Sequence, residues 1–248
     1  MPELAPAPET ATTALLTVEC QSGVVGAESA LPELALEARE SGMLGRVAAL
    51  VAAAHRAGVQ VLHAVAERRP DGLGANTNAR LFRAAGKLPV RQLSGSRAVQ
   101  VAAPIEVAER DLVVRRLHGL SPMAGTDLDP LLRNLDIRTL VVTGVSSNIA
   151  IPNTVFDAVN LGYRVVVPSD AICGVPATYT DAVLRNSLSL VAAITTTEAL
   201  LKQWAGHPRP ADDRTASARG NPVGRGDHDA CAGGGALGTS QGAGNRLS

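Results

Sequence analysis

Short apolar runs rich in β-branched residues alternate with Ala- and Leu-rich runs through most of the chain. Runs such as LVVTG and RVVVPSD contain no regular alternation of apolar and polar positions, which is typical of strands covered by helices on both faces. The predicted strands are residues 14–18, 59–65, 112–115, 139–143, 164–167 and 191–195. The predicted helices are residues 43–57, 126–134, 147–161, 178–188 and 197–204.

This alternation of strands and helices predicts an α/β fold with three layers, in which a doubly wound, mostly parallel sheet of six strands lies between helices. In such folds ligands bind beyond the carboxyl ends of the strands. Residues that directly follow a strand are therefore the candidates for function, whereas residues within strands are expected to serve packing.

The two ends of the chain differ in composition from the rest. Residues 1–12 are rich in Pro, Ala and Thr and predict a flexible arm. From residue 205 to 248 the chain consists largely of Gly, Pro, Asp, Arg and Ser, and it cannot bury enough apolar surface to offset its ordering entropy. We expect a disordered tail there and one folded domain over residues 13–204.

Composition narrows the classes of partner. Hydrophobic residues make up 46% of the 248 residues, enough for a sizeable core, and 23 basic residues balance 23 acidic ones. A neutral, scattered charge gives no electrostatic reason to expect a nucleic acid or a membrane as partner. The N-terminus lacks a basic secretion signal, and no apolar segment reaches the roughly 20 residues of a membrane span. The expected location is the cytoplasm.

Two strand ends carry candidate groups for chemistry. Glu19 follows the first strand in LLTVECQSG, where a carboxylate can act as a general acid or base, although a solvated glutamate at the start of a loop fits the pattern too. His63 lies inside the second strand and is expected to be a hydrogen-bonded core residue. The polar loop that follows carries Asn76 and Asn78, and it either closes over a ligand or is a solvated excursion.

Basic residues gather where the third strand ends, in RRLHGLSPMAGTD. Arg115 and Arg116 can clamp a carboxylate, and His118 stands close behind them. Arginines on the surface of a strand end are an equally good reading of this pattern.

The fourth strand and its turn, TGVSSNIAIPNT, give the strongest signal. Backbone N–H groups at the start of a helix are unpaired and can hold a negative oxygen. The residues in this position are Val145, Ser146, Ser147, Asn148 and Ala150. The simpler alternative is an ordinary turn in which Ser147 or Asn148 only caps the helix.

Taken together, these segments resemble the isochorismatase-like (cysteine hydrolase) family. TGVSSNIAIPNT followed by GYRVVVPSDA resembles the family signature, LLTVECQ resembles its first strand, which ends in Asp-x-Gln, and HGLSPMAGTDLDPLLRNLDIRTLVVTG resembles its third strand, loop and connecting helix. The resemblance covers roughly residues 13–200. It implies a Rossmann-like topology, hydrolysis of a small molecule, and a homodimer or higher homo-oligomer.

The family's catalytic triad consists of Cys, Asp and Lys, and this chain departs from it. By position the cysteine falls on Ala150 and the aspartate on Glu19, and a cis peptide of the family falls between Val145 and Ser146. A thiol mechanism at residue 150 is therefore excluded.

For the lysine of the triad, the spacing of residues leaves three positions open. Counting back from Gly125 and Thr126 places it on Leu117, and a loop longer or shorter by one residue offers Arg116 or His118 instead. Of these, Arg116 would keep a permanent cation.

Three named readings of the missing nucleophile remain open, and chemistry that the pattern does not reveal, such as a metal site, is the fourth. The first is a hydrolase like the family's isochorismatases, which also lack the cysteine: Glu19 acts as general acid/base, and Arg116 or His118 binds a small anionic substrate. The second moves thiol chemistry to Cys20 or Cys173. The third is an inactive member that binds a small molecule or a partner protein.

Cofactors and metals are not expected. The three cysteines, the third being Cys231, show no C-x-x-C spacing for zinc and are too few for a disulfide framework. Nicotinamidases of this family carry a metal, but only His63 and His118 could serve here as ligands, so we expect no metal site.

Overall fold

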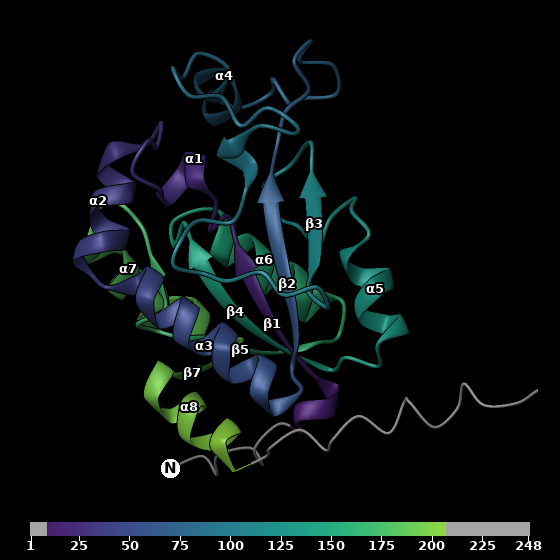
Figure 1. The fold of residues 1–248 in the computed structure, drawn as a ribbon. Helices are drawn as coiled ribbons and strands as arrows, with labels where there is room; N and C mark the ends of the chain where they lie inside the picture. Colours follow the sequence, from purple (N-terminus) through teal and green to yellow (C-terminus); the bar gives the residue numbers. More distant parts are fainter. Residues whose placement is uncertain (1–8, 207–248) are drawn as a thin grey trace, which may run out of the picture. The chain divides into compact units, whose positions relative to one another are not determined.

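The structure is a computed structural model that describes residues 9–206 (Figure 1). Most of the predicted arm and all of the predicted tail beyond Gly206 lie outside the described residues. The end of the arm is ordered into a 3-10 helix, η1 (Thr10–Thr12), because the Thr13 hydroxyl donates to the Glu9 carbonyl at 2.7 Å. The last helix continues one residue beyond the predicted domain, to Ala205.

A parallel sheet forms the centre of the domain, as predicted. Its strands are β1 (Thr13–Val18), β2 (Gln60–Ala66), β3 (Leu112–Arg116), β4 (Thr139–Val145), β5 (Arg164–Pro168), β6 (Ile172–Cys173) and β7 (Ala193–Thr195). They follow the order β3-β2-β1-β4-β5-β7, with β6 paired to β4, and every pairing is parallel. The six predicted strands are confirmed, and the seventh, β6, has only two residues and left no pattern to detect.

Helices cover both faces of the sheet (Figure 1). They are α1 (Ser22–Val25), α2 (Pro32–Glu40), α3 (Met43–Ala57), α4 (Arg80–Ala85), α5 (Leu128–Asn134), α6 (Ala150–Asn160), α7 (Ala177–Asn186) and α8 (Thr197–Ala205), with 3-10 helices η2 (Arg97–Val99) and η3 (Leu188–Leu190). Residues of α2, α3 and α8 share one hydrophobic core with the sheet, and residues of α5, α6 and α7 share the other.

Adjacent residues of one strand serve these two cores. Leu15 packs in the core with α3, and its neighbour Leu16 packs in the core with α6; both are fully buried. Successive side chains of a strand point to opposite faces, so a strand covered twice must be apolar at every position. This is why the strands show no alternating pattern in the sequence.

Several segments differ from the sequence prediction, and helices α1 and α2 were not predicted at all. Helix α6 begins at Ala150 rather than at Ser147, because the Ser147 N–H donates to the Cys173 carbonyl at 2.8 Å and the turn must pass beside β6 before the helix starts. The connection between β2 and β3, residues 67–111, is called here the β2–β3 crossover. It contains only the short α4 and η2, which were not predicted, and α4 lies beyond the carboxyl ends of β2 and β3 (Figure 1).

Candidate active site

A cavity of about 250 Å³ lies beyond the carboxyl ends of four neighbouring strands. Its base is formed by residues at or just after β1, β2, β3 and β4, namely Glu19, Glu67, Arg116 and Ser146, and by Ala150 at the start of α6. The crossover and the start of α2 supply the remaining wall. The cavity therefore stands where a doubly wound sheet binds its ligands.

Glu19 and Arg116 form an ion pair at the base of the cavity, with Arg116 Nη2 donating to Glu19 Oε1. Glu19 adopts a left-handed backbone (φ 52°), uncommon outside glycine, and its N–H donates to the Ala64 carbonyl at 2.8 Å. The backbone therefore turns directly after β1, and it places the carboxylate opposite the end of β3. The pairing supports Arg116, rather than Leu117, as the residue in the lysine position.

One nitrogen of this pair is left without a partner. The Arg116 side chain is only 7% exposed, and its Nη1 has no hydrogen-bond partner within residues 9–206. A buried, unpaired donor of a charged group is costly unless something accepts from it. Because Arg116 lines the cavity, an acceptor oxygen of a ligand is the natural partner for Nη1.

The turn after β4 supplies two further donors. The peptide between Val145 and Ser146 is cis, which confirms the position implied by the family resemblance. The Ile149 and Ile151 N–H groups donate to the Ser146 carbonyl at 3.2 and 3.0 Å. Neither the Ser146 N–H nor the Ala150 N–H donates to another residue of the described part, and both residues line the cavity. These two groups can hold a negative oxygen.

Three other residues of the turn lie away from the cavity. Val145 is fully buried in the core with α3. The Ser147 hydroxyl hydrogen-bonds to that of Thr180 at 2.7 Å, and the Asn148 amide donates to the Val175 carbonyl at 3.2 Å. The structure therefore brings Ser146 and Ala150 to the candidate site, whereas Val145, Ser147 and Asn148 hold the turn against the neighbouring loop and helix.

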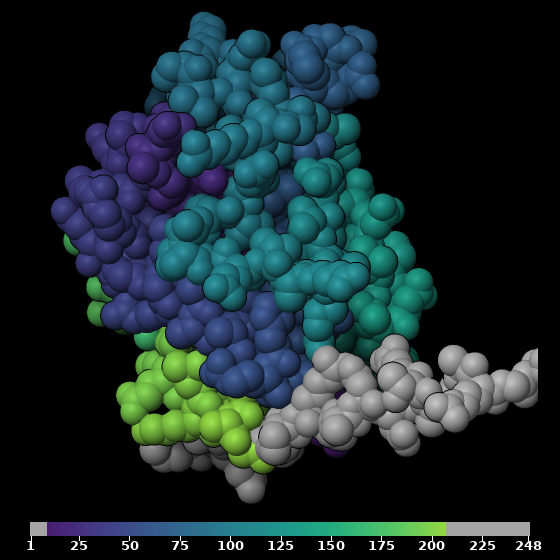
Figure 2. Space-filling model, viewed as in Figure 1, coloured from purple at the N-terminus to yellow at the C-terminus, as the bar shows by residue number. Residues whose placement is uncertain are grey.

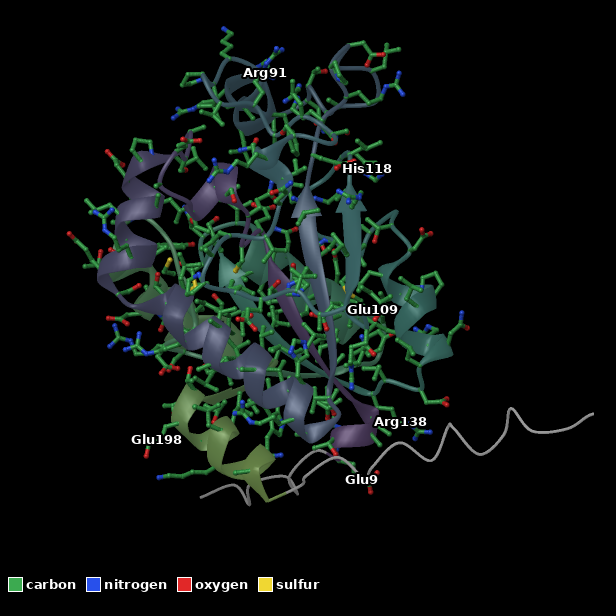
Figure 3. The ribbon with its side chains drawn as sticks, viewed as in Figure 1. Glu9, Arg91, Glu109, His118, Arg138 and Glu198 are labelled. Atoms are coloured by element: carbon green, nitrogen blue, oxygen red, sulfur yellow. The ribbon has the colours of Figure 1, made fainter. Side chains whose placement is uncertain are left out.

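His118 and Asn76 line the rim of the cavity. His118 is exposed, hydrogen-bonds to no other described residue, and lies at the carboxyl end of β3 (Figure 3). The Asn76 side-chain oxygen Oδ1 accepts from the Gly119 N–H at 2.7 Å, and Asn76 Nδ2 donates to Asn78 Oδ1 at 3.2 Å. The polar loop of the crossover is therefore anchored to the loop after β3 rather than free in solvent.

Glu67 was missed in the sequence, although it directly follows the second strand and satisfies the rule used for Glu19. Its carboxylate accepts from Arg115 Nη1 at 3.2 Å and from the Ser94 hydroxyl at 3.1 Å. Arg115 thus neutralises Glu67, while Arg116, the next residue, faces Glu19. The two arginines expected to clamp one anion serve different carboxylates.

The remaining candidates from the sequence lie in the core. Cys20 and Cys173 are buried at 3% and 2% exposure and do not line the cavity. Burial raises the pKa of the Cys20 thiol far above its usual range and that of Cys173 to about 12, so neither is a ready nucleophile, and the reading based on these thiols is wrong. His63 is fully buried and hydrogen-bonds to the Thr17 hydroxyl at 2.8 Å, which confirms a core role.

Within residues 9–206 no group of three or more His, Cys, Asp or Glu side chains could hold a metal ion. No helix in this part of the chain is both long and apolar enough to cross a bilayer.

Known proteins resemble this chain in both sequence and fold. The protein-family model of the isochorismatase domain matches residues 13–199 of the sequence. Streptothricin hydrolase of Streptomyces noursei is 30% identical over 158 residues, which is 64% of this chain and 48% of that protein. The chain spans about half the length of the curated relatives it matches, between 42% and 54%.

Solved structures share the fold over a larger part of the chain. An isochorismatase family protein of Desulfovibrio vulgaris is 27% identical, with a TM-score of 0.67 over 78% of this chain and 98% of that one. A cysteine hydrolase of Pseudomonas syringae pv. phaseolicola has a TM-score of 0.70 at 22% identity, over 84% of this chain and 100% of that one. The family model spans most of the chain, and it includes every strand and the residues at the base of the cavity. The chain belongs to the isochorismatase family, with the family's hydrolase fold.

Proposed function

We propose that the chain hydrolyses a small anionic metabolite by acid–base catalysis without a covalent intermediate, with Glu19 as the group that moves the proton. One observation carries the proposal. The Glu19–Arg116 pair and the two unpaired N–H groups of Ser146 and Ala150 line the same cavity. A proton acceptor and an oxyanion site therefore face one space, as hydrolysis of a carbonyl compound requires.

In the proposed reaction, water next to the Ala150 methyl group attacks the substrate carbonyl while Glu19 takes its proton. The negative charge develops on the carbonyl oxygen, where the N–H groups of Ser146 and Ala150 stabilise it. Glu19 then gives the proton to the leaving group as the bond to it breaks. Arg116 stabilises the carboxylate through Nη2 and offers Nη1 to an oxygen of the substrate.

The ion pair also favours one of two roles for Glu19. Protonating a vinyl ether, as in the family's isochorismatases, requires a protonated Glu19 at the start of the reaction. In the structure Glu19 Oε1 instead accepts a hydrogen bond from the Arg116 guanidinium, an arrangement that suits a carboxylate receiving a proton from water. This arrangement supports a general base that acts on a carbonyl compound such as an amide or ester, and streptothricin hydrolase is a relative named as a hydrolase.

The test is hydrolysis by the purified full chain of small amides and esters that carry a carboxylate, with isochorismate included. Glu19→Gln should lower kcat/KM about 10²- to 10⁴-fold, the usual contribution of a general base. Glu198→Gln is the matched control, because Glu198 lies on α8 at the far end of the domain (Figure 3). Equal kcat/KM for Glu19→Gln and the unmodified chain would rule out the proposed role.

An inactive binding protein is the second candidate, and the methyl group of Ala150 at the nucleophile position favours it. It predicts that ligands bind in the cavity while every substrate of the panel stays intact. The homodimer or higher oligomer implied by the resemblance remains a prediction, which analytical ultracentrifugation of the full chain would test.

A further inference from the structure

One part of the cavity wall is apolar. Leu81 and Phe82 of α4 line it, together with Leu88 after α4 and Leu31 and Leu34 at the start of α2. Leu81 is 49% exposed and Leu31 is 38% exposed, so apolar surface of the wall remains in contact with solvent. A ligand that covers this surface gains from the hydrophobic effect.

The part of the β2–β3 crossover that contains α4 is strongly basic. Residues 68–97 carry seven basic side chains and a single acidic one, Asp71, although the chain as a whole is neutral. Asp71 is paired with Arg69. Four others, Arg80, Arg83, Lys87 and Arg91, form no ion pair with any described residue.

This charge lies beside the cavity. Arg80 and Arg83 belong to α4, the helix that supplies Leu81 and Phe82 to the wall. Arg91 lies beyond the carboxyl ends of the strands, the end at which His118 is found (Figure 3), and the segment forms the top of the face seen in Figure 2. A concentration of one sign of charge near a cavity raises the local concentration of ligands of the opposite sign.

We infer that the substrate is an amphiphilic anion, with a short aliphatic or aryl group against α4 and α2 and its hydrolysable bond at Glu19. The inference rests on the proposed function, because it assigns the apolar half of the same site. The cavity of about 250 Å³ lies below the range of roughly 300–1,000 Å³ typical of drug-sized ligands, so the apolar group is short.

Binding of simple carboxylates tests the inference without requiring turnover. Acetate, butyrate and hexanoate are titrated into the full chain by calorimetry at low ionic strength. Each methylene that enters the cavity should tighten Kd about two- to fourfold, the upper value corresponding to about 0.8 kcal/mol. Leu81→Asn and Phe82→Ala should flatten this dependence on chain length.

The control for the apolar wall is Leu73→Ala. Leu73 belongs to the same crossover, is 67% exposed and does not line the cavity, so its substitution should leave the series as it is. The control for charge is hexanamide, which should bind more weakly than hexanoate at low salt and should respond less to added salt. Equal Kd values for acetate and hexanoate, or an unchanged series in both Leu81→Asn and Phe82→Ala, would overturn the inference.

This experiment separates the two proposals. If hexanoate binds as expected while no amide or ester is hydrolysed, the apolar subsite stands and the proposed hydrolysis fails. If Glu19→Gln abolishes hydrolysis of polar amides while chain length has no effect on binding, the hydrolysis stands and the amphiphilic substrate is wrong.

Discussion

Gly144 offers the sharpest test of the turn that carries the candidate oxyanion site. It directly precedes the cis peptide, and its φ of 106° is one that residues with side chains rarely adopt. A Cβ at this position would lie 2.2 Å from the Val18 carbonyl oxygen and 2.9 Å from Cys20 Sγ. Val18 is paired with Gly144 in the middle of the sheet, so its backbone cannot move aside without disturbing β1.

The magnitude of Gly144→Ala follows from these two effects. The unfavourable backbone conformation costs about 1–2 kcal/mol, and forcing a methyl group into a packed interior costs about 1–3 kcal/mol. The free energy of unfolding should therefore fall by about 2–5 kcal/mol, out of about 5–15 kcal/mol for a typical domain. For a domain of this size that corresponds to a fall in Tm of about 4–20 °C.

Urea unfolding followed by tryptophan fluorescence measures this loss, since Trp204 is the one tryptophan of the chain and is buried at 2% exposure. Gly45→Ala is the matched control. Gly45 lies inside α3, and a Cβ there meets nothing within 4 Å, so alanine should stabilise the helix by about 0.5–1 kcal/mol. A Gly144→Ala protein as stable as the unmodified one would refute the description of this turn.

Two further predictions concern thiols and pH. In the Ala150→Cys variant, iodoacetamide should label residue 150, because that residue lines the cavity. Peptide mapping of the folded protein should show Cys20 and Cys173 unlabelled. Labelling of either cysteine would contradict its burial. Desolvation lowers the pKa of His63 below its usual 6.5, so the unfolded chain binds a proton that the folded one rejects, and stability should fall as pH drops below about 6.5. Urea midpoints should decline from about pH 7.5 to about pH 5. The decline should be smaller in His63→Gln, and an identical decline would assign the effect to other groups.

Elements with strong local signals could be predicted from the sequence. Helix α3 was predicted with its observed bounds, because an Ala-rich apolar pattern runs up to Gly58, which ends the helix with φ 74°. Helix α4 was missed, since its six residues give too short a period to recognise and its apolar side chains contact a cavity rather than a core. Helix α2 was missed as well, although Leu34 and Ala38 pack in the core with α3, so a short helix leaves a weak pattern wherever it packs.

In the candidate site, too, some features could be predicted from the local sequence and others could not. Glu19 and Arg116 were found because each stands at a strand end, a property that the sequence reveals. Their pairing could not be predicted, because it depends on the left-handed backbone at Glu19. It also depends on the length of the loop between β3 and Gly125, and counting back along that loop placed the lysine position on Leu117. Ser147 was assigned to the oxyanion site because its N–H stands at a helix start, yet that group is taken by Cys173, a residue distant in sequence.

In the β2–β3 crossover the residues that would contact the ligand's apolar part are separate from Glu19 and Arg116, the residues proposed for catalysis. Many enzymes combine these two tasks in the same residues. The base of the crossover is fastened where Arg68 pairs with Leu93 and where the Gln92 amide donates to the Gly23 carbonyl at 3.0 Å. No strand of the sheet lies between these two contacts, so we expect changes of length and sequence there to leave the register of the strands unaltered. Replacing this segment, in evolution or by design, would therefore change which ligand binds while Glu19 and Arg116 stay in place.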